Sequence, residues 1–329
     1  MDQPLNLGLS LGYGWTPEQI CHLGREADSH GFHSIWLPEL QGVETLSTIG
    51  ALSQITERIR LGTGVVNVYS RSVAILAMAA ATLDILSSGR FILGLGASTR
   101  PIVENWHGGR FAHPGIRVEE SVKAIKALLG GKTEYEGTEV RIRSFRPTVK
   151  PIQRDLPVFV AAVSDGMVRV AARAADGVIF FLRPPEAVKH ALSVVKAEAS
   201  ASETPRPLEI ACSIVTCPSK DLHAAEARAR QTIAHYVAVG AYYRGLLNAF
   251  GFSEVEAIAS EWSSGQREEA ASRVSDRLLE ALSLYGPAEE CRNGLQRFLD
   301  AGVSLPILQV NKVGDLDETL AEVLKIPPA

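Results

Sequence analysis

The chain has 329 residues, of which 46% are hydrophobic and 21% charged, and its 33 basic and 37 acidic side chains give a formal net charge of −4. This balance argues against nucleic-acid binding, because nucleic-acid-binding domains typically have a basic face and a pI above about 9. The length is sufficient for one α/β barrel of about 250 residues with insertions.

The sequence also argues against a secreted or membrane-bound protein. The four cysteines form no CxxC pair and are typical of buried thiols in a reducing compartment. The N-terminal residues lack the charged-then-apolar order of a signal peptide. The longest apolar run, residues 73–81, is too short to span a bilayer. We therefore expect a cytoplasmic protein without a nucleic-acid or membrane partner.

Apolar runs of strand length alternate with stretches of helical periodicity along most of the chain. The sequence predicts strands over residues 5–11, 33–37, 59–64, 91–96, 158–162, 178–181, 208–215 and 307–310. It predicts helices over residues 17–29, 46–55, 73–86, 117–129, 165–175, 186–199 and 316–324. Because strands that alternate with helices form right-handed βαβ units, we expect a closed (β/α)8 TIM barrel. An open doubly wound sheet requires a GxGxxG turn after the first strand, which residues 12–15 do not match.

Two segments interrupt this alternation within the single domain that we expect over residues 1–329. Residues 132–150 contain a turn at Glu136-Gly137 and predict an excursion over one end of the barrel. Residues 221–284 predict a helical insertion after strand seven. The insertion contains a cluster of aromatic residues: Tyr236, Tyr242, Tyr243, Phe250, Phe252 and Trp262. Such a cluster favours a small core or a dimer surface over a ligand-binding wall.

The active site of such a barrel lies at the carboxyl ends of its strands. Strands three, four and five end in small residues, over residues 62–65, 94–98 and 161–164. The shortage of side chains predicts a slot in which a flat ring lies close to the backbone. The alternative is that these glycines only serve turns and bulges.

Polar residues near the same strand ends are candidates for binding and catalysis. Ser164 begins helix five, whose first amides favour an anion such as phosphate, although serine is also an ordinary helix cap. Glu39 follows strand two and is placed to accept a hydrogen bond from a ring or a substrate; its alternative role is a salt bridge at the rim. His107 and His113 lie in the loop after strand four, near the barrel mouth. The alternative for both is that they are solvated surface residues without a function in the site.

Arg183 follows strand six in the sequence Phe180-Phe181-Leu182-Arg183, just after two phenylalanines. Pro184 disfavours helical geometry at Arg183 and so fixes the direction of the loop. A guanidinium above an apolar wall suits an anionic ligand, because its planar fork grips a carboxylate or a phosphate with two hydrogen bonds. The alternative is a structural ion pair with a neighbouring loop.

Several segments together resemble the luciferase-like flavin and deazaflavin superfamily. They are residues 31–39, 61–65, 70–71, 83–90, 93–97, 157–162, 174–178 and 285–287. The sequence is most similar to the branch that uses coenzyme F420, which includes methylenetetrahydromethanopterin reductase. The resemblance implies a (β/α)8 barrel and a bulge after strand three with a non-proline cis peptide bond, by position Gly64-Val65.

The resemblance also implies a set of ligand-binding residues. The bulge supports one face of the cofactor ring, and residues 161–167 hold the phosphate side of the cofactor. The implied cofactor-binding residues are Gly64, Val65, Gly96, Ala97, Ala161, Ala162, Val163, Ser164, Asp165, Gly166 and Met167. Arg183 and His107 are then candidates for substrate binding, and Arg183 also for the acidic tail of F420. Glu39 is the candidate catalytic residue, and the sequence implies no metal.

The sequence departs from relatives that oxidise sugar phosphates or secondary alcohols. Those relatives have a histidine directly after the acidic residue of strand two and a glutamate after strand four, where this chain has Leu40 and Ala97. These residues are therefore more consistent with hydride delivery from reduced F420 to an activated C=N or C=C acceptor than with deprotonation of an alcohol. In hydride delivery the protein supplies mainly orientation and one proton donor.

The leading hypothesis is an oxidoreductase that transfers a hydride between F420 and a small organic substrate. The alternatives are an FMN-dependent monooxygenase that uses reduced flavin and oxygen, and a flavin-binding barrel without turnover. The expected partners are a small-molecule substrate and a second copy of the chain in a homodimer.

Overall fold

The computed structural model describes residues 5–11, 14–202 and 206–327. The expectations that rest on residues 1–4 and on residues 12 and 13 lie outside these ranges. Within the described part of the chain, no helix is long and apolar enough to cross a membrane.

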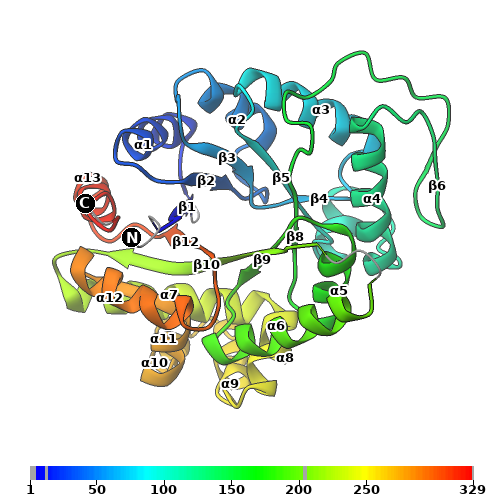
Figure 1. Cartoon of the computed structure of the whole chain (residues 1–329). Helices are drawn as coiled ribbons and strands as arrows, with labels where there is room; N and C mark the ends of the chain where they lie inside the picture. Colours follow the sequence, from blue (N-terminus) through cyan, green and yellow to red (C-terminus); the bar gives the residue numbers. More distant parts are fainter. Residues whose placement is uncertain (1–4, 12–13, 203–205, 328–329) are drawn as a thin grey trace.

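Eight parallel strands of the described chain close a barrel, which confirms the predicted fold class (Figure 1). Their order around the barrel is β1 (Gly8–Leu11), β2 (Ser34–Leu37), β3 (Arg60–Thr63), β5 (Phe91–Gly96), β8 (Val158–Ala161), β9 (Gly177–Phe181), β10 (Glu209–Pro218) and β12 (Leu305–Val310). The barrel closes where β12 pairs with β1, with Gln309 opposite Ser10. The predicted strands match these ranges to within three residues at either end.

Helices surround the barrel, as Figure 1 shows. They are α1 (Pro17–Ser29), α2 (Thr45–Ser53), α3 (Val73–Leu86), α4 (Pro114–Leu129), α5 (Asp165–Ala174), α6 (Pro185–Ser200), α12 (Ala288–Leu299) and α13 (Leu316–Val323). Local chemistry explains why α1 begins where it does: Thr16 and Gln19 form a capping box, with hydrogen bonds of 3.3 and 3.0 Å. Helix α12 was not predicted, although its buried Ala288, Cys291, Leu295 and Phe298 follow a helical spacing.

The first interruption is a short antiparallel hairpin. Strands β6 (Tyr135–Glu136) and β7 (Arg141–Ile142) pair across the predicted turn. The segment lies on the outer side of α4 in Figure 1. Glu120 of α4 fixes the turn, because its carboxylate accepts hydrogen bonds from the amides of Thr138, Glu139 and Val140.

The second interruption contains five helices and then a strand. The helices are α7 (Leu222–Val239), α8 (Ala241–Ala249), α9 (Val255–Ser263), α10 (Arg267–Ser272) and α11 (Asp276–Leu282). They share a core of their own, in which Phe252 is fully buried and Tyr236, Tyr243, Phe250 and Trp262 pack at its edge. The interpretation of the aromatic residues as a small core is confirmed, although Tyr242 is exposed.

The predicted helical end at residue 284 is wrong. Ser283 and Leu284 belong to β11 (Ser283–Gly286), which pairs in parallel with Val215–Pro218 at the extended end of β10. The strand forms there because β10 runs beyond the barrel and offers an open edge. A sequence pattern alone does not reveal such an edge.

The inside of the barrel is packed with side chains rather than hollow. The buried residues there are Trp36, Ile92, Phe159, Ile179, Ala211, Leu305 and Ile307. The rings of Trp36 and Phe159 are in contact, with 5.4 Å between their centroids. The indole N–H of Trp36 donates a 2.9 Å hydrogen bond to Ser34 Oγ, so this buried polar group is satisfied.

Candidate active site

Strand geometry identifies the next layer of side chains toward the carboxyl end of the barrel. Side chains two residues apart on a strand point to the same face. The interior residues Phe159, Ile179, Ala211 and Ile307 are therefore followed on that face by Ala161, Phe181, Ser213 and Gln309. Ala161, Phe181 and Ser213 are partly exposed, whereas the layer beneath is buried. The accessible end of the barrel is thus its carboxyl-terminal end.

Strand β3 leaves the barrel in a bulge at this end. The Gly64-Val65 peptide bond is cis, as the resemblance implied, and the chain then rejoins β5 as β4 (Val66–Asn67). The buried Thr63 hydroxyl bridges the gap: it donates to the carbonyl of Gly94 and accepts from the amide of Gly94, both at 2.7 Å. The amide of Gly64 donates to the carbonyl of Leu37 at 2.8 Å, which ties the bulge to the end of β2.

The glycines at these strand ends make room for the protein itself. A Cβ on Gly94 would lie 1.9 Å from the Thr63 carbonyl oxygen, and one on Gly96 would lie 2.8 Å from Val65 Cγ2. A Cβ on Gly62 would lie 2.4 Å from the Trp36 ring. At Gly62, Gly94 and Gly96 the alternative, that the glycines serve the bulge, is therefore correct, while a slot at the other small residues of these strand ends stays a prediction. The partly exposed Gly64 and Val65 form the surface instead.

The segment after β8 is open on the side that faces the start of α5. Ser164 caps this helix by accepting from the amide of Met167 at 3.3 Å, while Ala162 is buried behind it. A Cβ on Gly166 would meet only Ser164 Oγ, at 3.8 Å. The first two amides of a helix, here those of Asp165 and Gly166, have no partner within the helix. The start of α5 at Gly166 is therefore exposed and has room for an added side chain.

Asp165 places a negative charge beside these donors. Its carboxylate pairs with His190 of α6, with 2.9 Å between Oδ2 and Nε2. Both side chains are more than a third exposed, so solvent screens the pair strongly.

Arg183 lies behind the same segment, and its predicted role needs correction. The side chain is only 1% exposed, and its guanidinium stacks on Phe180 at 4.5 Å. It donates to the carbonyl of Ala187 at 3.0 Å and to the carbonyl of Val163. Burial lowers the pKa of this guanidinium from its usual value. Arg183 therefore supports the segment through Val163, rather than reaching an anionic ligand directly.

Glu39 is held by an arginine that the sequence analysis did not single out. The two terminal nitrogens of Arg71 donate to the two oxygens of Glu39 at 2.6 and 2.7 Å. The hydrogen bonds to Glu39 are the main cause of a raised pKa of Arg71. Arg71 also contacts Glu44, the cap residue of α2. The rim salt bridge weighed as the alternative for Glu39 is thus present, and a catalytic role stays a prediction.

The two histidines after β5 lie in the loop that leads to α4. His107 follows the π-helical turn η1 (Ile102–Trp106) and is exposed. His113 pairs with Glu139 of the hairpin, with 2.6 Å between Nδ1 and Oε1. A substrate contact of His107 remains a prediction.

A polar cluster on the opposite side of the barrel end escaped the sequence analysis. The side-chain amide of Gln309 donates to the Tyr236 hydroxyl at 2.9 Å and accepts from Asn311 at 2.8 Å. The ring of Tyr236 meets Phe181 edge-on, with centroids 4.7 Å apart. The sequence contained a signal for Gln309: it lies two residues after Ile307 on a predicted strand, so its side chain is on the same face as that interior residue. The insertion thus contributes Tyr236 to the barrel end.

A closed (β/α)8 barrel with a bulge after its third strand defines the class of this protein. The sequence model of the family described as luciferase-like monooxygenase matches residues 6–305. The chain therefore belongs to the luciferase-like family, as the resemblance implied.

Comparison with individual proteins shows what this chain is similar to. It is 26% identical over 308 residues to the 5,10-methylenetetrahydromethanopterin reductase of Methanolobus tindarius, covering 90% of this chain and 92% of the relative. Its fold matches the F420-dependent tetrahydromethanopterin reductase of Methanopyrus kandleri with a TM-score of 0.84 at 23% identity, covering 98% of both chains. An FMN complex of the oxygenating constituent of 3,6-diketocamphane monooxygenase from Pseudomonas putida matches with a TM-score of 0.71 at 16% identity, covering 99% and 97%.

The tight approach of β5 to the bulge predicts the effect of a small substitution. We expect Gly94→Ala to lower the free energy of unfolding by about 1–3 kcal/mol or more, because the new methyl group meets a backbone oxygen. Gly166→Ala is the matched control, since a methyl group there meets no close atom. Urea unfolding followed by circular dichroism measures both. Equal midpoints for Gly94→Ala and the wild type would contradict the close approach.

Proposed function

We propose that this protein is an oxidoreductase that transfers a hydride between coenzyme F420 and a small organic substrate. The observation that carries the proposal is the bulge of Gly64 and Val65 at the accessible end of the barrel. The luciferase-like family contains both F420-dependent reductases and FMN-dependent monooxygenases among the relatives named above. The similarity to methylenetetrahydromethanopterin reductases along about nine-tenths of the chain favours F420.

The residues at the barrel end fit a flat cofactor with an anionic tail. Gly64 and Val65 would support one face of the ring, and the partly exposed Ala97 and Ala161 would leave the neighbouring strand ends without large side chains. The buried Gly96 would take part by making room for Val65. The stretch from Ala162 to Met167 would hold the phosphate, because a helix begins there, its first amides have no partner within the helix, and Gly166 is exposed. Arg183 would keep this stretch in place from behind through the Val163 carbonyl.

The chemistry that F420 supplies when bound is the transfer of a hydride. The protein's part is to orient the substrate and to exclude water from the reacting atoms. Val65 would offer apolar contact beside the bulge. Gln309 and Tyr236 would offer polar groups fixed by their mutual hydrogen bond, with the apolar ring of Phe181 packed edge-on against Tyr236. His107 is a further substrate contact in this proposal.

Glu39 is the ionisable group that we propose for proton exchange or electrostatic stabilisation. Its side chain is 11% exposed, and Arg71 fixes both of its oxygens. A carboxylate held in this way is pre-oriented and costs little reorganisation during a reaction. The connection between Gly64 and Leu37 keeps the bulge next to the strand that carries Glu39.

Absorbance titration of the purified protein with F420 and, separately, with FMN tests the proposal. We expect saturable binding of F420, and oxidation of reduced F420 by candidate acceptors at equal rates with and without oxygen. Deazaflavin carries carbon in place of N5 and reacts poorly with oxygen, whereas reduced FMN reacts readily. Turnover that requires FMN and oxygen would replace the proposal with a monooxygenase, and cofactor binding without any turnover would indicate a non-catalytic barrel.

A charge placed at the start of α5 tests the assignment of the phosphate. We expect Gly166→Asp to weaken F420 binding at least about tenfold, because a carboxylate would face the phosphate in the space that Gly166 leaves open. Gly166→Ala adds a methyl group without the charge and should bind F420 as the wild type does. Isothermal titration calorimetry measures both variants. Unchanged F420 affinity in Gly166→Asp would remove this segment from the cofactor site.

A pair of glutamates on one arginine allows a controlled test of Glu39. We expect Glu39→Gln to lower kcat by roughly 10²–10⁴-fold, the range typical of lost acid–base assistance. Glu44→Gln is the control, because Glu44 shares Arg71 but is 46% exposed on its side chain. Steady-state kinetics across pH compares the two variants. If Glu39→Gln keeps the turnover of Glu44→Gln, Glu39 only forms a rim ion pair.

A further inference from the structure

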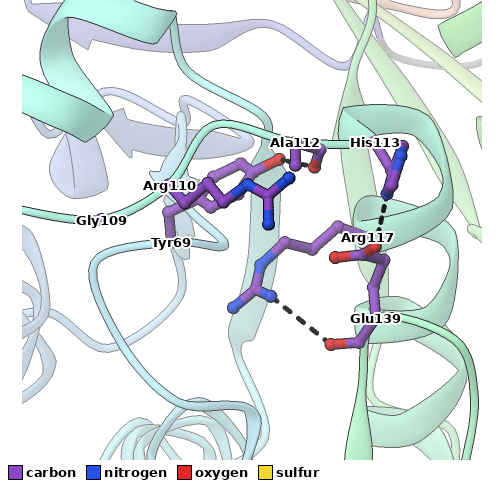
Figure 2. Close-up of a pocket in the computed structure, with 7 residues that line it drawn as sticks. All are labelled: Tyr69, Gly109, Arg110, Ala112, His113, Arg117 and Glu139. Atoms are coloured by element: carbon purple, nitrogen blue, oxygen red, sulfur yellow. Dashed lines mark hydrogen bonds and ion pairs between the residues drawn. The ribbon is translucent and has the colours of Figure 1, made fainter.

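A cavity of about 300 Å³ lies outside the barrel end, between the start of α4, the hairpin and the segment after the bulge. Figure 2 shows the residues that line it. Tyr69 forms one wall, and its hydroxyl donates to the carbonyl of Ala112 at 2.8 Å, which fixes that wall. His113 and Glu139 form another wall through their 2.6 Å contact. The cavity therefore has walls fixed by hydrogen bonds.

Two arginines point into this cavity. Figure 2 shows the guanidinium groups of Arg110 and Arg117 extending into the same space. The guanidinium of Arg117 lies over the Tyr69 ring at 4.8 Å, and its contacts with the carbonyls of Val68 and Glu139 are long, at 3.4 Å each. Most of the hydrogen-bonding capacity of this fork is therefore available to a ligand.

The charges around the cavity are not balanced by the protein. Among its lining residues, Arg110 and Arg117 carry two positive charges, and Glu139 carries the carboxylate, which His113 already contacts. Two guanidinium groups that share one space repel each other unless an anion lies between them. The cap residue of α4, His113, provides no side-chain hydrogen bond to the helix, so the positive end of the helix dipole adds to this field.

We propose that this cavity is a binding subsite for an oxyanion, a carboxylate or a phosphate, on a ligand that extends outward from the barrel end. A planar fork at Arg117, a second cation at Arg110 and an uncapped helix start match that chemistry. The cavity has room for one such group together with a few neighbouring atoms.

The chain connects this subsite to the bulge over a short distance. Tyr69 follows Val65 by four residues, and four residues span at most about 14 Å when fully extended. A ligand whose ring lies on the bulge therefore reaches the cavity with a flexible tail of moderate length. Under the proposed function, on which this step rests, the glutamate tail of F420 is one source of the oxyanion; an anionic substrate or free phosphate is the other.

The experiment compares F420 that carries its glutamate tail with F420 that lacks it, at low ionic strength. We expect the wild type to bind the tailed form about tenfold more tightly, the loss typical of one charge-assisted hydrogen bond. Arg110→Ala and Arg117→Gln should bind both forms equally. Arg25→Ala, which removes an exposed arginine from α1, is the matched control and should keep the wild-type preference.

A second arm uses inorganic phosphate, with the shift of the melting temperature as its readout. If the tail makes no difference but phosphate stabilises the wild type and not Arg110→Ala or Arg117→Gln, the subsite takes the oxyanion of another ligand, and the proposal stands. If neither the tail nor phosphate distinguishes these variants from the wild type, the proposal is overturned. If F420 fails to bind at all, the proposed function fails, and the phosphate arm alone decides the subsite.

Discussion

Strand β3 leaves the barrel ladder at Thr63, and the organisation of the site depends on how that departure is accommodated. The Thr63 hydroxyl pairs with both the carbonyl and the amide of Gly94, so that these two backbone groups keep a partner at the break. Gly94 and Gly96 then allow the displaced chain to lie directly against β5. Because the bulge also bonds to the end of β2 through Leu37, three neighbouring strands hold one short segment at the accessible end of the barrel.

The arginines around the barrel end are of two kinds: those whose guanidinium is bound by other protein groups and those that line a cavity. Arg183 is buried and serves the backbone of the segment after β8. Arg71 is shared between two carboxylates and fixes the orientation of Glu39. Arg110 and Arg117 line a cavity whose one lining carboxylate, that of Glu139, pairs with His113. The surroundings of these arginines thus differ: one guanidinium bonds backbone carbonyls, one bonds two carboxylates, and two line a cavity.

The insertion after β10 has a core of its own and also contacts the end of the barrel. Its helices bury a core of their own around Phe252 and Leu278. Tyr236 of the same insertion reaches Gln309 on β12 and Phe181 on β9. The barrel end is therefore partly built from a segment outside the regular alternation of strands and helices. Such a segment varies most easily between relatives that share a barrel, because the barrel core does not depend on it.

The sequence by itself determined the barrel, since the periodicity of apolar residues reports the local geometry of each strand and helix. The predicted bounds of the helix over Val73–Leu86 agree with the structure residue for residue. The small residues at the strand ends allowed two interpretations, a slot or a bulge, and the neighbours of Gly62, Gly94 and Gly96 show that these three serve the bulge. Only the tertiary structure decided the partners: Thr63 with Gly94, 31 residues apart, Glu39 with Arg71, 32 residues apart, and β11 with the extended end of β10. Contacts of this kind form when the barrel closes and brings distant segments together. The local pattern of apolar residues does not specify which segments become neighbours.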